Sequence, residues 1–210
     1  FGNPRVDDPH APNPAMGQFV DLGAFERQER QQSDVDLATV AVSGPATGLP
    51  DQLANVSWTV ENRGTATAIG PWHDAVYLSP DPVWTPDDLF LKDFEHLDAL
   101  GAGQSYTTGG TVTLPGMLPE NYHFLVRTNS LTEVFEGQAY LNNAGASAAT
   151  IAMDLRPLVP GTPFLDEILE AGDSRYYKVT VAAGSDLVIA LDGQGFAENE
   201  LYIRFGELPT

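Results

Sequence analysis

The chain has 210 residues, of which 42% are hydrophobic, so it can bury the core of one large domain or two small ones. Its 29 acidic and 10 basic residues give a formal charge of -19, which repels nucleic-acid backbones and anionic membrane surfaces. It contains no cysteine, which excludes disulfides, thiolate metal sites and cysteine nucleophiles.

Turn-forming residues are frequent, with 20 glycines and 16 prolines, and they favour an all-β class. No apolar run reaches the roughly 18 residues of a membrane-spanning helix, which predicts no membrane insertion. The sequence begins at Phe1 and shows no signal peptide. We therefore expect a segment of a longer chain, with further domains of the same parent chain as neighbours.

The first 33 residues are rich in proline, asparagine and aspartate, and they end in a polar run at 29–33 that is typical of a linker. Two short motifs lie within them, NPR at 3–5 followed by Asp8, and DLGAFE at 21–26. These motifs resemble the closing turn of right-handed parallel β-helix proteins. The resemblance implies that residues 1–33 are the tail of an upstream β-helix followed by a linker.

Residues 34–154 consist of short alternating runs separated by turns. In the run 53–61, Val56, Trp58 and Val60 share one face, the period-two pattern of a half-buried strand. A large aromatic in the middle of such a strand is a good core anchor, so we expect Trp58 to be buried. The predicted strands are 36–42, 53–61, 74–79, 89–94, 110–114, 121–128 and 146–153. Seven short strands with regular turns are typical of an immunoglobulin-like antiparallel β-sandwich.

Three motifs in this segment carry a family resemblance: VSWTVENRGTA at 56–66, DAVYLSPD at 74–81, and EVFE at 133–136 followed by Asn142 and Asn143. Together they resemble the cell-adhesion-related domain found in bacteria (CARDB). Residues 137–141 lengthen the spacing before the asparagine pair relative to the family pattern. The resemblance implies an immunoglobulin-like fold and an adhesion or spacer role that is extracellular or at the bacterial cell surface.

A proline-rich joint at 156–163 precedes a third segment, in which alternation predicts strands at 176–181, 186–192 and 200–205. The motifs LEAGDSRYYKVTV at 169–181, GSDLVIALD at 184–192 and NELYIRFG at 199–206 look like the first half of a bacterial pre-peptidase C-terminal domain. That resemblance implies a partial second, jelly-roll-like β-sandwich over 155–210.

The acidic loop 79–88 joins two predicted strands and offers Asp81, Asp87 and Asp88 close together in sequence. Ca²⁺ prefers about six to eight oxygen ligands, and a proline-stiffened acidic loop can supply several, so these aspartates are the candidate metal ligands. The spacing differs from that of an EF-hand loop. The alternative is a solvated turn in which proline and aspartate serve the turn geometry. Calcium is the one cofactor that the sequence suggests.

Two further acidic clusters raise the same question. Glu133 and Glu136 with Asn142 and Asn143 could coordinate an ion or could hold a loop through hydrogen bonds to backbone. The other cluster is Asp192, Glu198, Asn199 and Glu200. The four histidines, His10, His73, His96 and His123, show no zinc-binding spacing, and we expect His123 to be exposed.

No nucleophile elbow and no phosphate-binding glycine loop occurs in the sequence. Trp72 and Trp84 flank or enter the acidic loop and could stack on a sugar ring, or could cover the end of the sandwich. The sequence thus predicts a non-enzymatic adhesion, binding or spacer module of a large bacterial surface or secreted protein, whose partner is a surface protein or a glycan. The alternatives are an accessory region of a secreted polysaccharide lyase or peptidase, and an acidic scaffold without a ligand.

Overall fold

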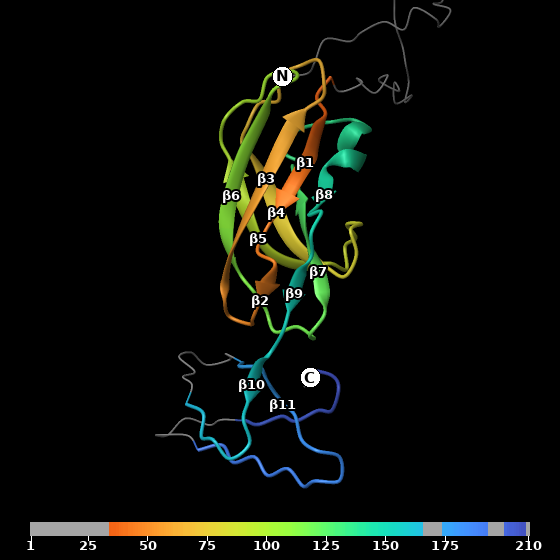
Figure 1. The fold of residues 1–210 in the computed structure, drawn as a ribbon. Helices are drawn as coiled ribbons and strands as arrows, with labels where there is room; N and C mark the ends of the chain where they lie inside the picture. The colour runs from red at the N-terminus through yellow and green to blue at the C-terminus, as the bar shows by residue number, and fades with distance from the viewer. Residues whose placement is uncertain (1–33, 166–173, 193–199, 209–210) are drawn as a thin grey trace, which may run out of the picture. The chain divides into compact units, whose positions relative to one another are not determined.

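The computed structural model describes residues 34–165, 174–192 and 200–208. The predicted β-helix tail at 1–33 lies outside these residues, as do Glu198 and Asn199. The described part of the chain is all-β except for one short 3-10 helix, which confirms the predicted class (Figure 1). No helix within it is long and apolar enough to cross a membrane.

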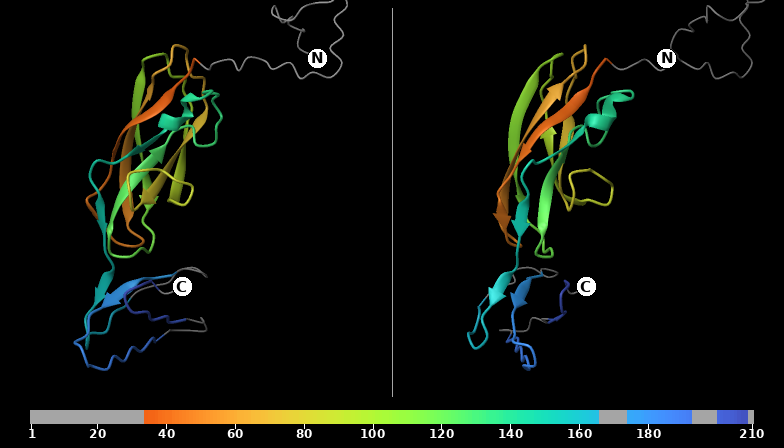
Figure 2. Two further views of the ribbon diagram at one scale, coloured as in Figure 1. Left: turned by 90° about the vertical axis from the view of Figure 1, so that its right-hand side faces the viewer. Right: turned by 45° about the vertical axis from the view of Figure 1, so that its right-hand side comes forward.

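Two sheets form a β-sandwich, seen from two further sides in Figure 2. The smaller sheet has the antiparallel order β1-β3-β6 and contains β1 (Leu37–Ser43), β3 (Leu53–Asn62) and β6 (Ser105–Thr113). The larger sheet has the order β2-β9-β7-β4-β5, and β8 also pairs with β7. Its strands are β2 (Thr47–Gly48), β4 (Trp72–Ser79), β5 (Leu89–His96), β7 (Asn121–Arg127), β8 (Ala144–Ala146) and β9 (Ile151–Met153). The helix η1 (Ala139–Asn142) precedes β8.

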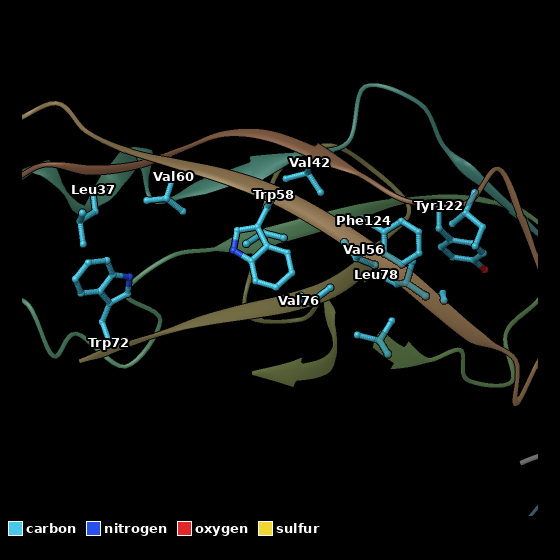
Figure 3. Packing of buried hydrophobic residues seen from close by; sticks show 14 of the residues in the cluster. Leu37, Val42, Val56, Trp58, Val60, Trp72, Val76, Leu78, Tyr122 and Phe124 are labelled. Carbon is cyan, nitrogen blue, oxygen red and sulfur yellow. The ribbon is translucent and has the colours of Figure 1, made fainter. Parts of the chain in front are cut away.

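The inward faces of the two sheets fill the interior with large side chains. Trp58, Trp72 and Phe124 are the largest fully buried residues, and Figure 3 shows them between the strands. Val56 and Val60 are buried beside Trp58, so the predicted alternation of the run 53–61 is confirmed. The interior therefore follows directly from the period-two pattern of the sequence.

Of the two alternatives for Trp72, stacking on a sugar ring is wrong, because the residue is 0% exposed and cannot reach a ligand at the surface. The strand β4 begins two residues before the predicted strand 74–79. Trp72 therefore continues the inward row that Asp74, Val76 and Leu78 form. Because β4 starts earlier than the predicted strand, Trp72 lies within the strand and points into the core rather than into the loop.

Other boundaries differ for physical reasons. The two residues of β2 are too few to show a periodicity, so this strand was missed. β6 begins at Ser105 rather than at 110, because its first half is polar and exposed and carries no hydrophobic alternation. The predicted strand 146–153 is two strands, β8 and β9.

In the third segment, β10 (Arg156–Leu158) and β11 (Tyr177–Val179) form a two-stranded parallel pair. The predicted strand 176–181 is thus present in part, whereas 186–192 and 200–205 are not strands. Leu187 and Leu191, the alternating residues of 186–192, are 39% and 52% exposed, so no second layer covers them in the described residues. The jelly-roll-like sandwich and the three domain boundaries stay predictions.

Candidate functional site

Loop 79–88 leaves β4 and returns as β5, and it stands out from the larger sheet (Figure 2). The Asp81 carboxylate accepts a hydrogen bond of 2.8 Å from the backbone N–H of Val83. At the other end, the Asp88 carboxylate accepts one of 2.6 Å from the N–H of Thr85. Both aspartates therefore hold the backbone of their own loop, as the turn alternative requires.

The candidate metal ligands Asp81, Asp87 and Asp88 are not preassembled. Within the described ranges, no three His, Cys, Asp or Glu side chains lie close enough together to hold a metal ion. An aspartate that holds a turn still has lone pairs to offer, since a carboxylate has about four acceptor positions. Calcium binding by this loop therefore stays a prediction.

Trp84 folds back from the loop onto the outer face of the larger sheet. The guanidinium of Arg127, on β7, lies 4.3 Å from the centroid of the Trp84 ring. Tyr77, on β4, meets the same ring edge-on at 6.0 Å, and Phe90, on β5, meets Tyr77 edge-on at 5.6 Å. Arg127 thus covers the indole, which favours the alternative that Trp84 packs on the sandwich over the one that it stacks on a sugar ring.

Apolar side chains remain exposed around this cluster. Val83 is 64% exposed at the tip of the loop, and Phe90 is 51% exposed on β5. Asp93 pairs with Ala75 across the strands, on the same face as Tyr77. We name this surface the β4–β5 face: its apolar members are Tyr77, Val83, Trp84 and Phe90, and its carboxylates are Asp81, Asp87, Asp88 and Asp93.

The cluster at 133–143 holds the sandwich together. Glu136 is buried, and its carboxylate accepts hydrogen bonds from the backbone N–H of Leu37 at 2.6 Å and from the side-chain amides of Asn129 and Asn143 at 2.6 and 2.7 Å. Burial raises the pKa of Glu136, and the three donors oppose that rise. The loop-holding alternative is confirmed for Glu136, whose lone pairs serve β1 and the neighbouring loop.

Glu133 contacts the start of β4 rather than an ion. Its carboxylate lies 2.5 Å from Nδ1 of His73 and accepts the backbone N–H of His73 at 2.8 Å. The hydrogen bond to Glu133 raises the pKa of His73. Asn142 donates to the Asp36 carboxylate at 2.7 Å, so it too joins this loop to the N-terminal end of the sandwich.

His96 and His123 have structural contacts, whereas His10 lies outside the described residues. His123 is half-buried, with Nδ1 2.9 Å from the backbone oxygen of Ser147, so the expected exposure was wrong. Strand β7 places it beside Ser147, in the segment that follows β8. His96 stacks on Tyr106 with ring centroids 3.9 Å apart. Of the third acidic cluster, Asp192 and Glu200 are exposed.

Sequence reasoning missed Asp74, the most buried carboxylate of the sandwich at 1% exposed. It accepts hydrogen bonds from Trp58 Nε1, the Tyr106 hydroxyl and the Thr128 hydroxyl. The available signal was an acidic residue in the inward row of β4. A buried charge needs partners of this kind, and here the fold itself supplies them.

The geometry defines a class of protein, an immunoglobulin-like β-sandwich in which the buried carboxylates of Asp74 and Glu136 accept hydrogen bonds from the fold. No protein-family model matches the sequence, and no curated protein matches it significantly. Among solved structures, it is similar to the CARDB domain of a Pyrococcus furiosus protein in complex with di-metal ions. The TM-score is 0.41 and the identity 17%, over 57% of this chain and 96% of that one.

Two enzymes also contain a region of similar structure. A β-glucosidase from Listeria innocua in complex with glucose matches with a TM-score of 0.34 and 16% identity, over 56% of this chain and 16% of the enzyme. A β-glucosidase from Erythrobacter marinus matches with a TM-score of 0.38 and 12% identity, over 56% and 16% of the two chains. The chain thus spans only a small part of either enzyme, and these likenesses assign no role to its residues.

Proposed function

We propose that this chain is a non-enzymatic extracellular binding module of a large bacterial surface or secreted protein, and that it contacts a protein partner through the β4–β5 face. The observation that carries the proposal is the exposure of Val83, next to Trp84 in the loop, and of Phe90, whose ring meets Tyr77 edge-on. Exposed apolar side chains that adjoin one another and are ringed by charges are typical of interaction sites.

The charges around these side chains indicate the chemistry of the partner. Asp81, Asp87 and Asp88 lie in the same loop as Val83 and Trp84, and Asp93 lies on the Tyr77 face of the sheet, in a chain with a formal charge of -19. Electrostatic complementarity favours a polypeptide that presents lysine or arginine beside apolar side chains. A protein surface of that kind fits better than a neutral glycan, because Arg127 already covers the Trp84 ring.

The loop is also stiff before any partner arrives. Pro80, Pro82 and Pro86 restrict its backbone, and Asp81 and Asp88 hold its two ends. A loop that is already ordered loses less conformational entropy on binding. Calcium held by Asp81, Asp87 and Asp88 would stiffen the same loop further, and we include this stabilisation in the proposal.

A non-catalytic role is supported by the way that the buried polar groups are used. Asp74 and Glu136, the two most buried carboxylates of the described residues, each accept three hydrogen bonds from the fold. Their acceptor positions serve the joining of strands and loops. A general base would instead need a lone pair directed at a substrate proton.

A direct test uses the full chain and two synthetic peptides, one alternating lysine with leucine and one alternating glutamate with leucine. The lysine peptide should bind, binding should weaken with salt, and the double variant V83S/F90S should bind at least about ten-fold more weakly. The matched control is I69S/L97S, which removes two apolar residues that are 68% and 70% exposed elsewhere.

Three outcomes would overturn the proposal: equal binding of both peptides, equal loss in both double variants, and turnover of a peptide or glycosidic bond by the chain itself. The accessory-region alternative predicts a different result. It requires retention of polysaccharide by the chain, with the lysine peptide unable to compete.

A further inference from the structure

The strand β6 ends the smaller sheet and leaves one backbone edge open. It pairs with β3 over nine consecutive residue pairs, from Ser105 opposite Glu61 to Thr113 opposite Leu53, with no register shift. No strand within the described ranges pairs with its other side. An edge of this length presents a row of free N–H and C=O groups that can accept another strand.

The other three sheet edges of the sandwich are protected against such pairing. β1 has a register shift after Thr39, and Glu136 and the backbone of Asn143 bind along it. β2 has only two residues. β5 has a register shift opposite Val76 and carries charged residues, Lys92 among them. Bulges, short strands, charges and covering loops are the devices that keep natural edges from pairing.

In the part of the chain that the structure describes, none of these devices is present on β6. Its nine residues contain no charge and no proline, and no charged residue occurs anywhere in 101–119, although 19% of the chain is charged. A Cβ on Gly110 would lie 2.1 Å from the Phe94 ring, and one on Gly109 would lie 2.8 Å from the Val56 carbonyl oxygen. Packing therefore keeps the centre of this edge free of side chains.

We infer that β6 pairs antiparallel with β6 of a second copy of this chain, which joins two smaller sheets into one continuous six-stranded sheet. In an antiparallel pair, opposing residues lie on the same face, so the two-fold axis passes through a residue position. With the axis at Gly109, Thr107 faces Thr111 of the second copy. Threonine pairs of this kind form favourable cross-strand contacts, and no like charges oppose each other.

The net charge makes the pairing depend on salt. Two chains of formal charge -19 repel each other over the Debye length, which is about 30 Å at 0.01 M ionic strength and about 3 Å at 1 M. The edge itself is neutral, so salt screens the repulsion without weakening the strand contacts. Association should therefore strengthen as salt rises, opposite to a contact between charges of unlike sign.

Sedimentation equilibrium of the full chain tests the inference. A monomer–dimer equilibrium should appear and shift toward dimer between about 0.01 and 1 M salt. The double variant T107K/T111K places lysines opposite each other and should raise the dimer dissociation constant at least about ten-fold. The control A41K/S43K adds the same two charges to exposed positions on β1, and should leave the dissociation constant unchanged.

Disulfide cross-linking reports the strand register directly. The chain has no cysteine, so any disulfide must join the introduced residues. A mixture of T107C and T111C chains should form a disulfide-linked dimer under mild oxidation, faster than either variant alone. A chain that stays monomeric at high concentration in 1 M salt would overturn the inference. So would equal effects of the two lysine pairs, or equal cross-linking of the mixture and of the single variants.

Discussion

The indole N–H of Trp58 donates a 2.7 Å hydrogen bond to the carboxylate of Asp74, and so joins β3 of the smaller sheet to β4 of the larger one. The same carboxylate accepts two further hydrogen bonds of 2.6 Å, one from the Tyr106 hydroxyl and one from the Thr128 hydroxyl. A β-sandwich is held mainly by apolar contact, which is non-directional. The hydrogen bonds of Asp74 are directional, and all of them form in only one alignment of the two sheets, so they help to fix that alignment.

The substitution Asp74→Ala should destabilise the sandwich by at least about 3 kcal/mol, because each of three buried donors loses its acceptor at about 1–3 kcal/mol. Asp74→Asn should destabilise the sandwich less than Asp74→Ala does. Its amide oxygen can accept from Trp58 and Tyr106, while its NH₂ donates to the Thr128 hydroxyl, which can rotate to accept. Urea unfolding of both variants measures the difference. A loss in Asp74→Asn as large as that in Asp74→Ala would contradict this account.

Tyr106 should make the fold sensitive to alkaline pH. Burial, followed by the charge of Asp74, raises its pKa far above the ordinary value of about 10. The folded state therefore keeps a proton that the unfolded chain releases, so this stability is present below pH 10 and is lost as the pH rises. The free energy of unfolding should fall above pH 10 by up to about 1.4 kcal/mol per pH unit.

The variant Tyr106→Phe separates this effect from general alkaline damage. It removes the hydroxyl, so its free energy of unfolding should fall less steeply above pH 10 even though it is less stable at pH 7. Tyr140→Phe is the control, since Tyr140 is 48% exposed. Its pH dependence should match the wild type. Identical slopes in all three proteins would show that Tyr106 does not carry the effect.

The strands of the sandwich could be predicted where every second residue is apolar and buried, as at Val56, Trp58 and Val60. The first half of β6 could not, because its inward positions there are Tyr106 and Thr108, which show no run of apolar residues. Strands 186–192 and 200–205 show the reverse error. Alternation alone predicts a strand, but a strand also needs a neighbour, and none pairs with them in the described residues.

The sequence identifies the loop that forms the candidate site, but it does not predict what the side chains of this loop contact. Charge and turn residues pointed to the loop with Asp81 and Asp88, yet a sequence does not tell whether a carboxylate faces solvent or binds its own backbone. The contact of Arg127 with Trp84 was out of reach because the two residues are distant in sequence. Such pairs are fixed by strand order, here the pairing of β7 with β4.

Glu136→Gln should destabilise the chain although it preserves size. In the wild type, one carboxylate oxygen accepts from Asn129 and Asn143 and the other from the N–H of Leu37. The glutamine NH₂ must point at one of these donors, which leaves a buried group unpaired at about 1–3 kcal/mol. Urea unfolding measures the loss. The control Glu120→Gln, at an exposed position, should be neutral, and equal stability of both variants would contradict the role of Glu136.

His73 should titrate above the ordinary histidine value of about 6.5, because its hydrogen bond to Glu133 raises the pKa, and Asp93 and Glu95 on the adjacent strand add to the rise. The stability gained from this pair is complete below pH 6.5 and is lost as the pH rises through the raised pKa. NMR titration of the His73 ring measures the value directly.

Glu133→Gln should bring the His73 titration down toward the ordinary value and flatten the pH dependence of stability around neutrality. Glu61→Gln is a matched control, because Glu61 is a half-buried carboxylate that pairs with Arg63 instead. An unchanged His73 titration in Glu133→Gln would show that the 2.5 Å contact does not set the protonation of the ring.

Calcium should raise the melting temperature of the chain if loop 79–88 binds it, because an ion that binds only the folded state stabilises that state by mass action. Asp87→Asn should remove the rise while leaving the metal-free melting temperature unchanged, since Asp87 is exposed, whereas Asp81 and Asp88 hold the loop backbone. Asp98→Asn, at an exposed position outside the loop, is the control and should keep the rise. Equal melting curves with calcium and with chelator would remove calcium from the proposal and leave the loop as a stiff acidic turn.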